Sequence, residues 1–148
     1  MKALIQRVTS ASVQVDGQTI GKIGQGIVVL LGITRTDTEK EVDYVLEKVV
    51  NCRIFPGDNP LSDFDKSLLD IQGGLLIVSQ FTLYGNLKKG RRPDFAEAAK
   101  PETAEKLYNL FVQKARQKQD LKVAAGQFKA HMEVGLTNDG PVTIMIES

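Results

Sequence analysis

Two short apolar segments constrain the fold of this chain more than any other feature. Residues 27–31 consist only of Ile, Val and Leu, and residues 75–83 form a second segment that is apolar in its first half. Both are far too short to cross a membrane as helices, and their composition favours strands. Because residues 27–31 offer no polar side to water, we predict a strand that is covered on both faces.

The segments around these two strands predict a chain rich in further strands. Residues 12–15 alternate between polar and apolar types and lead to Asp16-Gly17, a dipeptide suited to a tight turn. Residues 12–20 are therefore predicted to form a β-hairpin. The proline and glycine residues within 56–60, which disfavour helices and strands, start a polar loop. Further strands are predicted at residues 53–55, 68–71, 121–123, 128–136 and 142–147, and residues 138–141 are predicted to form a turn.

Two other segments have the period of amphipathic helices. Thr38 and Glu41 form a capping box, and the apolar residues that follow recur at helical spacing as far as Val50. A second helix begins at Pro101, a position where the missing N–H has no cost, and is predicted to end near Gln119.

Composition limits the class of protein. The 148 residues match the size of one domain, so we expect a single domain over residues 1–148. Nineteen Lys and Arg against eighteen Asp and Glu give a net charge of +1, which excludes global basicity as a sign of nucleic-acid binding. One Cys and one His form neither a disulfide framework nor a zinc cluster, so no metal or cofactor is expected. The absence of a signal peptide or long apolar segment predicts a soluble, cytoplasmic chain with no membrane partner.

Cationic residues are concentrated at one place despite the low net charge. Lys88, Lys89, Arg91 and Arg92 surround Gly90 and are followed by Pro93, which indicates a basic loop. The loop is either a solvated surface segment or a contact for an anionic partner.

Conventional pairs of nucleophile and base are scarce. His131 is the only histidine, and the sequence does not place it beside Ser79, Thr82 or Cys52. A partly exposed strand residue is the simpler interpretation of His131. Cys52 follows a helix among apolar neighbours, so we interpret it as a small core residue rather than a reactive thiol.

Residues 79–83 are more informative than any isolated nucleophile. Ser79, Gln80 and Thr82 place three hydrogen-bonding side chains at the end of the predicted strand 75–83, which is costly unless that end borders a pocket. Alternation along the strand offers a second interpretation, in which one face is merely solvated.

Four segments together resemble the D-aminoacyl-tRNA deacylases. They are the opening residues 3–8, the predicted strand 79–83, the segment 90–95 and the turn 138–143. The Ser-Gln-Phe-Thr strand and the Asn-x-Gly-Pro-x-Thr turn are the two hallmark motifs of that family, and both are intact. The resemblance covers essentially the whole chain.

The resemblance implies both a fold and a reaction. The fold is α+β, a β-rich barrel-like sheet with two main amphipathic helices, and the assembly is a homodimer. The reaction is hydrolysis of the ester that joins a D-amino acid to the terminal adenosine of tRNA, which serves chiral proofreading in translation. Because L-substrates would be rejected by exclusion, achiral glycyl-tRNA is expected to be hydrolysed as well.

The family pattern also implies roles for individual residues. The catalytic region corresponds to Ser79, Gln80, Phe81 and Thr82, with the Phe81 main-chain N–H helping to fix the terminal adenosine. Thr82 has been regarded in the family as a nucleophile, but the lack of an evident base favours a positioning role here.

Substrate binding and tRNA binding are expected elsewhere in the chain. The Gly140-Pro141 pair, cis in the family, would enter the partner subunit's site and face the α-carbon of the amino acid. Arg7 would orient its carbonyl groups, and Asn138 and Met132 are also assigned to substrate binding. The basic-loop residues Lys88, Lys89, Arg91 and Arg92 would contact phosphates of the acceptor stem.

One position departs from the family, and two other functions stay open. His131 stands next to Met132 where family members often carry an acidic residue, which argues against an essential catalytic histidine. The first other function is a tRNA-binding module without turnover. The second is a small-molecule esterase or amidase with Thr82 as its nucleophile.

Overall fold

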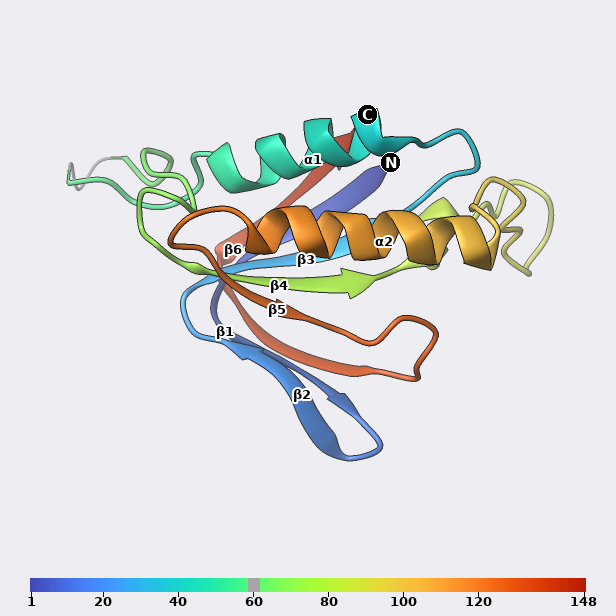
Figure 1. Cartoon of the computed structure of the whole chain (residues 1–148), viewed down its shortest axis with the longest axis horizontal. Coiled ribbons are helices and arrows are strands. Elements are labelled where there is room, and N and C mark those ends of the chain that lie inside the picture. Colours follow the sequence, from blue (N-terminus) through green and yellow to red (C-terminus); the bar gives the residue numbers. More distant parts are fainter. Residues whose placement is uncertain (59–61) are drawn as a thin grey trace.

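The computed structural model describes residues 1–58 and 62–148, and within them one curved sheet carries two helices on one face (Figure 1). The helices are α1 (Glu39–Asn51) and α2 (Pro101–Arg116), and a short 3-10 helix, η1 (Phe81–Tyr84), follows the fourth strand. The strands are β1 (Lys2–Val15), β2 (Gln18–Ile23), β3 (Gly26–Gly32), β4 (Gly74–Ser79), β5 (Lys122–Ala125) and β6 (Glu133–Glu147).

The long strand β1 organises the sheet. Its first half pairs with β3, its second half pairs with β2, and β6 runs antiparallel beside it for nearly its whole length. Strands β3, β4 and β5 then continue the sheet in parallel. The sheet curls until β5 approaches β2, so that a Cβ added to Gly21 would lie 3.3 Å from the Ala125 carbonyl oxygen. The predicted barrel-like α+β fold is therefore confirmed.

Local sequence signals explain the elements that were predicted correctly. Asp16 and Gly17 both have positive φ, as the tight turn between β1 and β2 requires. The Thr38 side chain accepts from the Lys40 N–H at 3.3 Å, while Glu41 accepts from the Thr38 N–H at 2.6 Å. The predicted capping box therefore starts α1.

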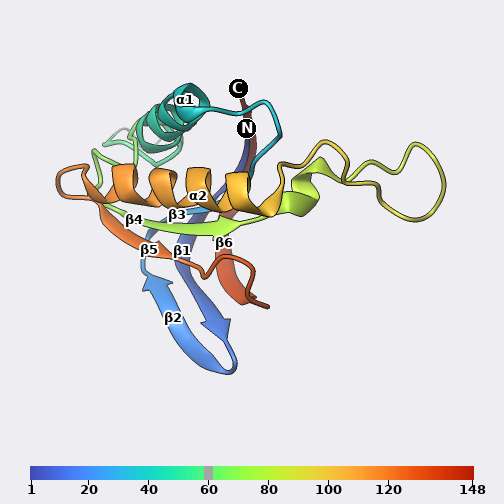
Figure 2. The ribbon, with the colours of Figure 1, turned by 45° about the vertical axis from the view of Figure 1, so that its right-hand side comes forward.

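The two helices form one layer over the sheet (Figures 1 and 2). Their inward faces close the main core, which includes Val45, Leu75, Ile77 and Phe111, all fully buried. On the outside, Lys114 of α2 lies 2.7 Å from Glu39 and 2.5 Å from Asp43 of α1. The helix α2 ends at Arg116, close to the predicted position.

The prediction of a strand through residue 83 was wrong. The strand β4 ends at Ser79, and its last ladder bond runs from the Gln80 N–H to the Leu31 carbonyl at 2.8 Å. The pairing of β4 with both neighbouring strands stops near this point, because β3 ends at Gly32 and β5 pairs only as far as Ile77 of β4. With no strand left to pair with, the chain coils into η1.

Two shorter predicted strands are also absent. Residues 53–55 make only an isolated bridge between Phe55 and Lys66, and Ile54 and Phe55 are apolar because they enter the core. Residues 68–71 form a turn in which the Ile71 N–H donates to the Ser67 carbonyl at 3.3 Å. Part of the predicted polar loop, residues 59–61, lies outside the described residues.

The C-terminal strand differs from its prediction as well. Residues 138–141 were predicted to turn between two strands, but they lie inside the single strand β6. The pairing with β1 shifts on both sides of Val8, so the motif is an irregularity opposite a continuous neighbour strand. Residues 128–132 precede β6 and are not strand; the Ala130 N–H donates to the Gln127 carbonyl at 3.2 Å in a turn.

Candidate functional site

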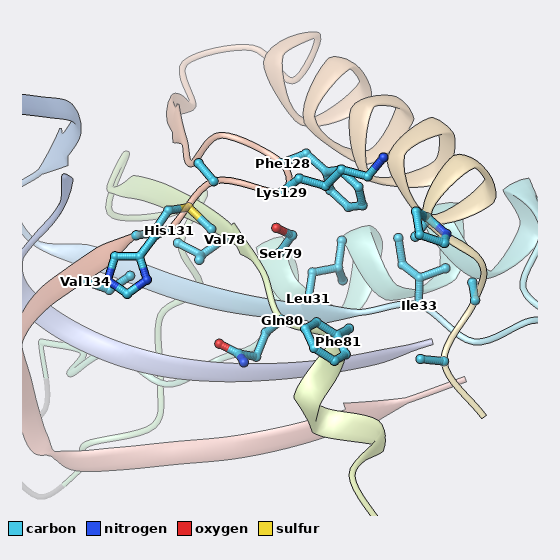
Figure 3. Close-up of a pocket in the computed structure, with 16 residues that line it drawn as sticks. Leu31, Ile33, Val78, Ser79, Gln80, Phe81, Phe128, Lys129, His131 and Val134 are labelled. Carbon is cyan, nitrogen blue, oxygen red and sulfur yellow. The ribbon is translucent and has the colours of Figure 1, made fainter. Parts of the chain in front are cut away.

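A cavity of about 540 Å³ opens where β3 and β4 end, beside the first turn of α2 (Figure 3). Leu31, Ile33 and Val78 form its apolar floor, and Ser79, Gln80 and Phe81 line one side. The segment from Phe128 to Met132 forms the opposite wall. This size and mostly apolar lining are typical of sites for small organic groups.

The end of β4 gives the cavity its polar side. Ser79 and Gln80 are half-buried, and Phe81 and Thr82 are exposed at the start of η1. The first N–H groups of any helix have no acceptor within that helix, so the 3-10 turn leaves the Phe81 and Thr82 N–H groups available at the cavity rim. The Gln80 side-chain amide donates to the Thr82 hydroxyl. Thr82 itself stands next to the cavity and is not among its lining residues.

The opposite wall is anchored from below by Tyr108. Its hydroxyl lies 3.0 Å from the carbonyl oxygens of both Ile77 and Gly126, and burial raises the pKa of Tyr108 to about 12. Phe128 packs against the Tyr108 ring with centroids 5.8 Å apart. A Cβ on Gly126 would lie 2.6 Å from the Met132 sulfur. These contacts hold the two ends of the wall, and Met132 is among the residues that line the cavity.

His131 and Cys52 are not brought to a nucleophile or base. His131 is exposed on the cavity wall, and among the hydrogen bonds of the described residues none joins it to Ser79, Thr82 or Cys52 (Figure 3). Cys52 is half-buried against the main core, where burial raises the pKa of its thiol. Its predicted role as a small packing residue is confirmed.

The second motif forms a rigid, exposed edge. Gly140 has φ +115°, a conformation that favours glycine, and the Gly140-Pro141 bond is cis. The Asn138 side chain accepts from the Val142 N–H at 3.3 Å and donates to the Thr143 hydroxyl at 2.9 Å. The side chain of Asn138 thus bridges the motif from within, while Gly140 and Pro141 face outward.

Arg7 holds this edge from beneath. It is only 5% exposed, and its Nε donates to the Asp139 carbonyl at 3.3 Å and pairs with the Asp139 carboxylate at 3.2 Å. Its Nη1 donates to the carbonyls of Ile54 at 2.7 Å and Asp63 at 3.3 Å. The hydrogen bonds of Arg7 therefore reach the carbonyl of Asp139, one residue before the Gly140-Pro141 pair.

One chain does not bring the cavity and the Gly140-Pro141 edge together. Ser79 pairs with Leu31, which pairs with Ala3 of β1, whereas Arg7 of β1 pairs with Ile27 at the other end of β3. Four residues along a strand span about 13 Å. The two predicted motif regions thus lie at opposite ends of the ladder that joins β1 to β3.

The predicted basic loop is an arm that projects from the body next to η1 (Figure 2). We call residues 86–94 the cationic arm. Its base is closed by two backbone hydrogen bonds between Asn86 and Asp94, at 2.8 and 2.9 Å, and its cations are all exposed. The next residue, Phe95, packs edge-on against Phe81 with centroids 5.0 Å apart, which fixes the arm to the cavity rim. The cations are Lys88, Lys89, Arg91 and Arg92.

Part of the cavity was not predicted from the sequence. Ala98, Ala99 and Pro101 line it because the start of α2 crosses its opening, and Phe128 and Lys129 line it from the wall. Small and apolar residues such as these carry no local signal for a site. Only the contact between distant segments reveals them.

The described part of the chain offers neither a metal cluster nor a membrane-spanning helix. No group of three or more His, Cys, Asp or Glu side chains within it is arranged to hold a metal ion. No helix within it combines the length and apolar character that crossing a membrane requires.

Comparisons with a family model and with curated proteins find the same family. A family model described as "D-Tyr-tRNA(Tyr) deacylase" matches residues 4–147. Proteins called D-aminoacyl-tRNA deacylase from Clostridioides difficile and Thermosipho melanesiensis are 54% and 51% identical to the chain, over all of it and 97% of their own length.

Solved structures agree on the fold. One described as "c-Myc DNA Unwinding Element Binding Protein" matches with a TM-score of 0.91 and 46% identity, over 100% of this chain and 99% of the other. A probable eukaryotic D-amino acid tRNA deacylase matches with a TM-score of 0.76 and 18% identity, over 98% of this chain and 97% of the other, and that likeness concerns the fold alone.

Proposed function

The chain belongs to the D-Tyr-tRNA(Tyr) deacylase family, and on that premise we propose that it hydrolyses the ester between a D-amino acid and the terminal adenosine of tRNA. It is an enzyme, a hydrolase of the D-aminoacyl-tRNA deacylase class, as its relatives of about 50% identity are named. The observation that carries the proposal is the cavity at residues 79–81, where the first hallmark motif ends in free N–H groups beside a mostly apolar pocket.

The cavity supplies the chemistry that this ester needs. Water attacks the ester carbonyl carbon, the bond to the ribose oxygen breaks, and that oxygen takes up a proton, which gives free amino acid and intact tRNA. The developing oxyanion needs preorganised donors, and the N–H groups of Phe81 and Thr82 at the start of η1 can provide them. An activated ester then requires mainly correct positioning. The terminal 2′-hydroxyl of the tRNA can assist the proton transfer.

Thr82 has a positioning role in this proposal. Its hydroxyl accepts from the Gln80 amide, and among the described hydrogen bonds no base accepts its proton. We therefore expect Thr82→Val to lower the rate of D-aminoacyl-tRNA hydrolysis by about 10- to 100-fold, as lost positioning does. A loss of about 10⁴-fold or more would instead favour a nucleophilic Thr82 and the small-molecule esterase. Single-turnover rates distinguish the two results.

Chirality is selected by exclusion in this proposal. D- and L-residues anchored by the same amine and ester exchange the positions of Hα and side chain, so a rigid wall near Cα rejects the L-form. The exposed edge at Gly140 and Pro141, held by buried Arg7, is suited to be that wall. Since it lies far from the cavity of its own chain, it would act on the cavity of a partner in a homodimer. Glycine has no side chain to exclude, so glycyl-tRNA would also be hydrolysed.

The cationic arm is proposed to hold the rest of the tRNA. It places four cations beside the cavity of a nearly neutral chain, and such clusters bind phosphates with strong salt dependence. Aminoacyl-tRNA is made in the cytoplasm, where we therefore place the reaction.

A deacylation assay with purified protein tests the function. We expect release of amino acid from D-tyrosyl-tRNA and glycyl-tRNA, and little release from L-tyrosyl-tRNA. Equal rates for the D- and L-esters would contradict selection by exclusion. Tight binding of tRNA without turnover of any ester would favour the tRNA-binding module.

A further inference from the structure

The cavity wall contains a cation to which the proposed reaction gives no role. Lys129 lines the cavity together with Phe128 and His131, on the side opposite Gln80 and Phe81 (Figure 3). Among the lining residues, Lys129 is the one that carries a permanent positive charge. A lysine at the rim of a mostly apolar cavity is suited to an anionic group of the ligand.

The backbone fixes the place of this lysine. Lys129 has φ +64°, a left-handed conformation that is uncommon for residues other than glycine. It sits in the turn closed by the hydrogen bond from the Ala130 N–H to the Gln127 carbonyl. On either side, Phe128 packs on Tyr108 and Met132 packs on Gly126. The start of the Lys129 side chain is thus held at the rim by its packed neighbours.

The ammonium group is available for a ligand. Its ionic neighbour is Glu105 of α2, with Nζ and Oε2 4.0 Å apart, at the limit of an ion pair. The side chains of Lys129 and Glu105 are 57% and 47% exposed. Ion pairs this long and this exposed contribute little, so an anion can replace Glu105 at small cost.

The proposed function identifies the anion, and this inference rests on it. If the terminal adenosine occupies the cavity, its ribose is joined to the rest of the tRNA through a 5′-phosphate. That phosphate cannot enter the apolar interior unpaired, because burying an unpaired charge is costly. It must stay at the rim, where Lys129 is the cation among the lining residues. We infer that Lys129 binds the phosphate that joins the last two nucleotides, a contact distinct from those of the cationic arm.

Two small esters that differ by one phosphate isolate this contact. D-Tyrosyl-adenosine and D-tyrosyl-adenosine 5′-monophosphate, each esterified at the ribose 2′ or 3′ oxygen, are compared by kcat/KM at low ionic strength. The wild-type protein should prefer the phosphorylated ester by about tenfold, as one charge-assisted hydrogen bond provides. Lys129→Gln should abolish the preference, Lys129→Arg should retain most of it, and added salt should weaken it.

The control variant is Lys106→Gln. Lys106 is an exposed lysine next to Glu105 on α2 that does not line the cavity, so its loss changes the net charge equally and should leave the preference unchanged. No preference in the wild type, or a Lys129→Gln variant that keeps it, would overturn the inference. An equal loss on both esters in Lys129→Gln would also overturn it, because that result indicates a structural role. Failure of the same wild-type protein to hydrolyse D-tyrosyl-tRNA would be a different result, which contradicts the proposed function itself.

Discussion

The two motifs of this chain lie at the two ends of the ladder between β1 and β3, and their surroundings differ. At the cavity end, Ser79 and Gln80 are half-buried beside open space, and Lys129 has only a long ion pair. At the other end, Arg7 is 5% exposed, and its Nε and Nη1 donate to backbone carbonyls that include that of Asp139, the residue before the outward-facing Gly140. The first end has room and donors for a ligand, while the second has a rigid surface and no cavity of its own among those described.

In the proposed reaction, neither end is complete alone. A pocket that works by positioning needs a wall that does not yield, and a rigid edge needs a pocket to act upon. One chain keeps the two about 13 Å apart along β1. The division explains why a homodimer fits the proposed reaction better than a single chain.

The largest expected effect tests the rigidity of the second end. Arg7→Met should lower the free energy of unfolding by about 3 kcal/mol, because buried carbonyls and the Asp139 carboxylate lose their partner. Denaturant unfolding of Arg53→Met is the matched control, since Arg53 pairs with Asp65 at 2.5 Å but is 64% exposed. The control should lose less than about 1 kcal/mol. Equal small losses would mean that the Gly140 edge is not held by Arg7.

A second effect tests whether the tRNA-binding surface extends from the cavity along the cationic arm. Replacing all four arm cations with Gln should raise KM for D-aminoacyl-tRNA and reduce the slope of log KM against log salt by about 3. The comparison variant neutralises four exposed lysines outside the arm and should keep most of the slope. Those lysines are Lys22, Lys40, Lys106 and Lys122. If both variants lose the same slope, the arm has no special role.

A smaller effect concerns the anchor of the cavity wall. Tyr108→Phe should lower the free energy of unfolding by about 1 kcal/mol, because the carbonyls of Ile77 and Gly126 lose their shared donor. The pH dependence of stability follows from the pKa of Tyr108, which burial raises from near 10 to about 12 in the folded chain. Between these values the unfolded chain has lost the tyrosine proton and the folded chain keeps it, so stability falls as pH rises.

The pH scan separates Tyr108 from other alkaline effects. Wild-type stability should decline more steeply than that of Tyr108→Phe between about pH 10 and 12. The same decline in both proteins would show that Tyr108 is not protected from titration by its burial.

Much of the fold was predictable because its signals are local. The Asp16-Gly17 turn and the Thr38 capping box each depend on neighbouring residues, and both form as expected. The end of β4 could not be predicted, because it depends on where β3 and β5 stop. For the same reason the second motif was predicted as a free turn, although the continuous strand β1 keeps it within β6.

The candidate site was predictable only in part. Its two motifs can be recognised in the sequence, and residues 79–81 of the first motif line the cavity. The position of Lys129 was not predictable, since a turn that contains one lysine resembles any solvated loop. The buried state of Arg7 was also hidden, because it requires Ile54 and Asp63 to approach from another part of the chain.

A mixed dimer tests most directly whether the two ends meet across subunits. Phe81→Pro removes a main-chain donor at the first position of η1, where proline fits, so its cavity should be inactive. Gly140→Ala would place a Cβ 2.9 Å from Arg7 Nη2 at φ +115°, so its edge should shift and lose selection against L-esters.

In a dimer of one subunit of each kind, purified by two different tags, the single active cavity belongs to the Gly140→Ala subunit. We expect the intact edge of the Phe81→Pro subunit to face this cavity, so that the ratio of D- to L-tyrosyl-tRNA hydrolysis returns to the wild-type value. A ratio equal to that of the Gly140→Ala homodimer would contradict it.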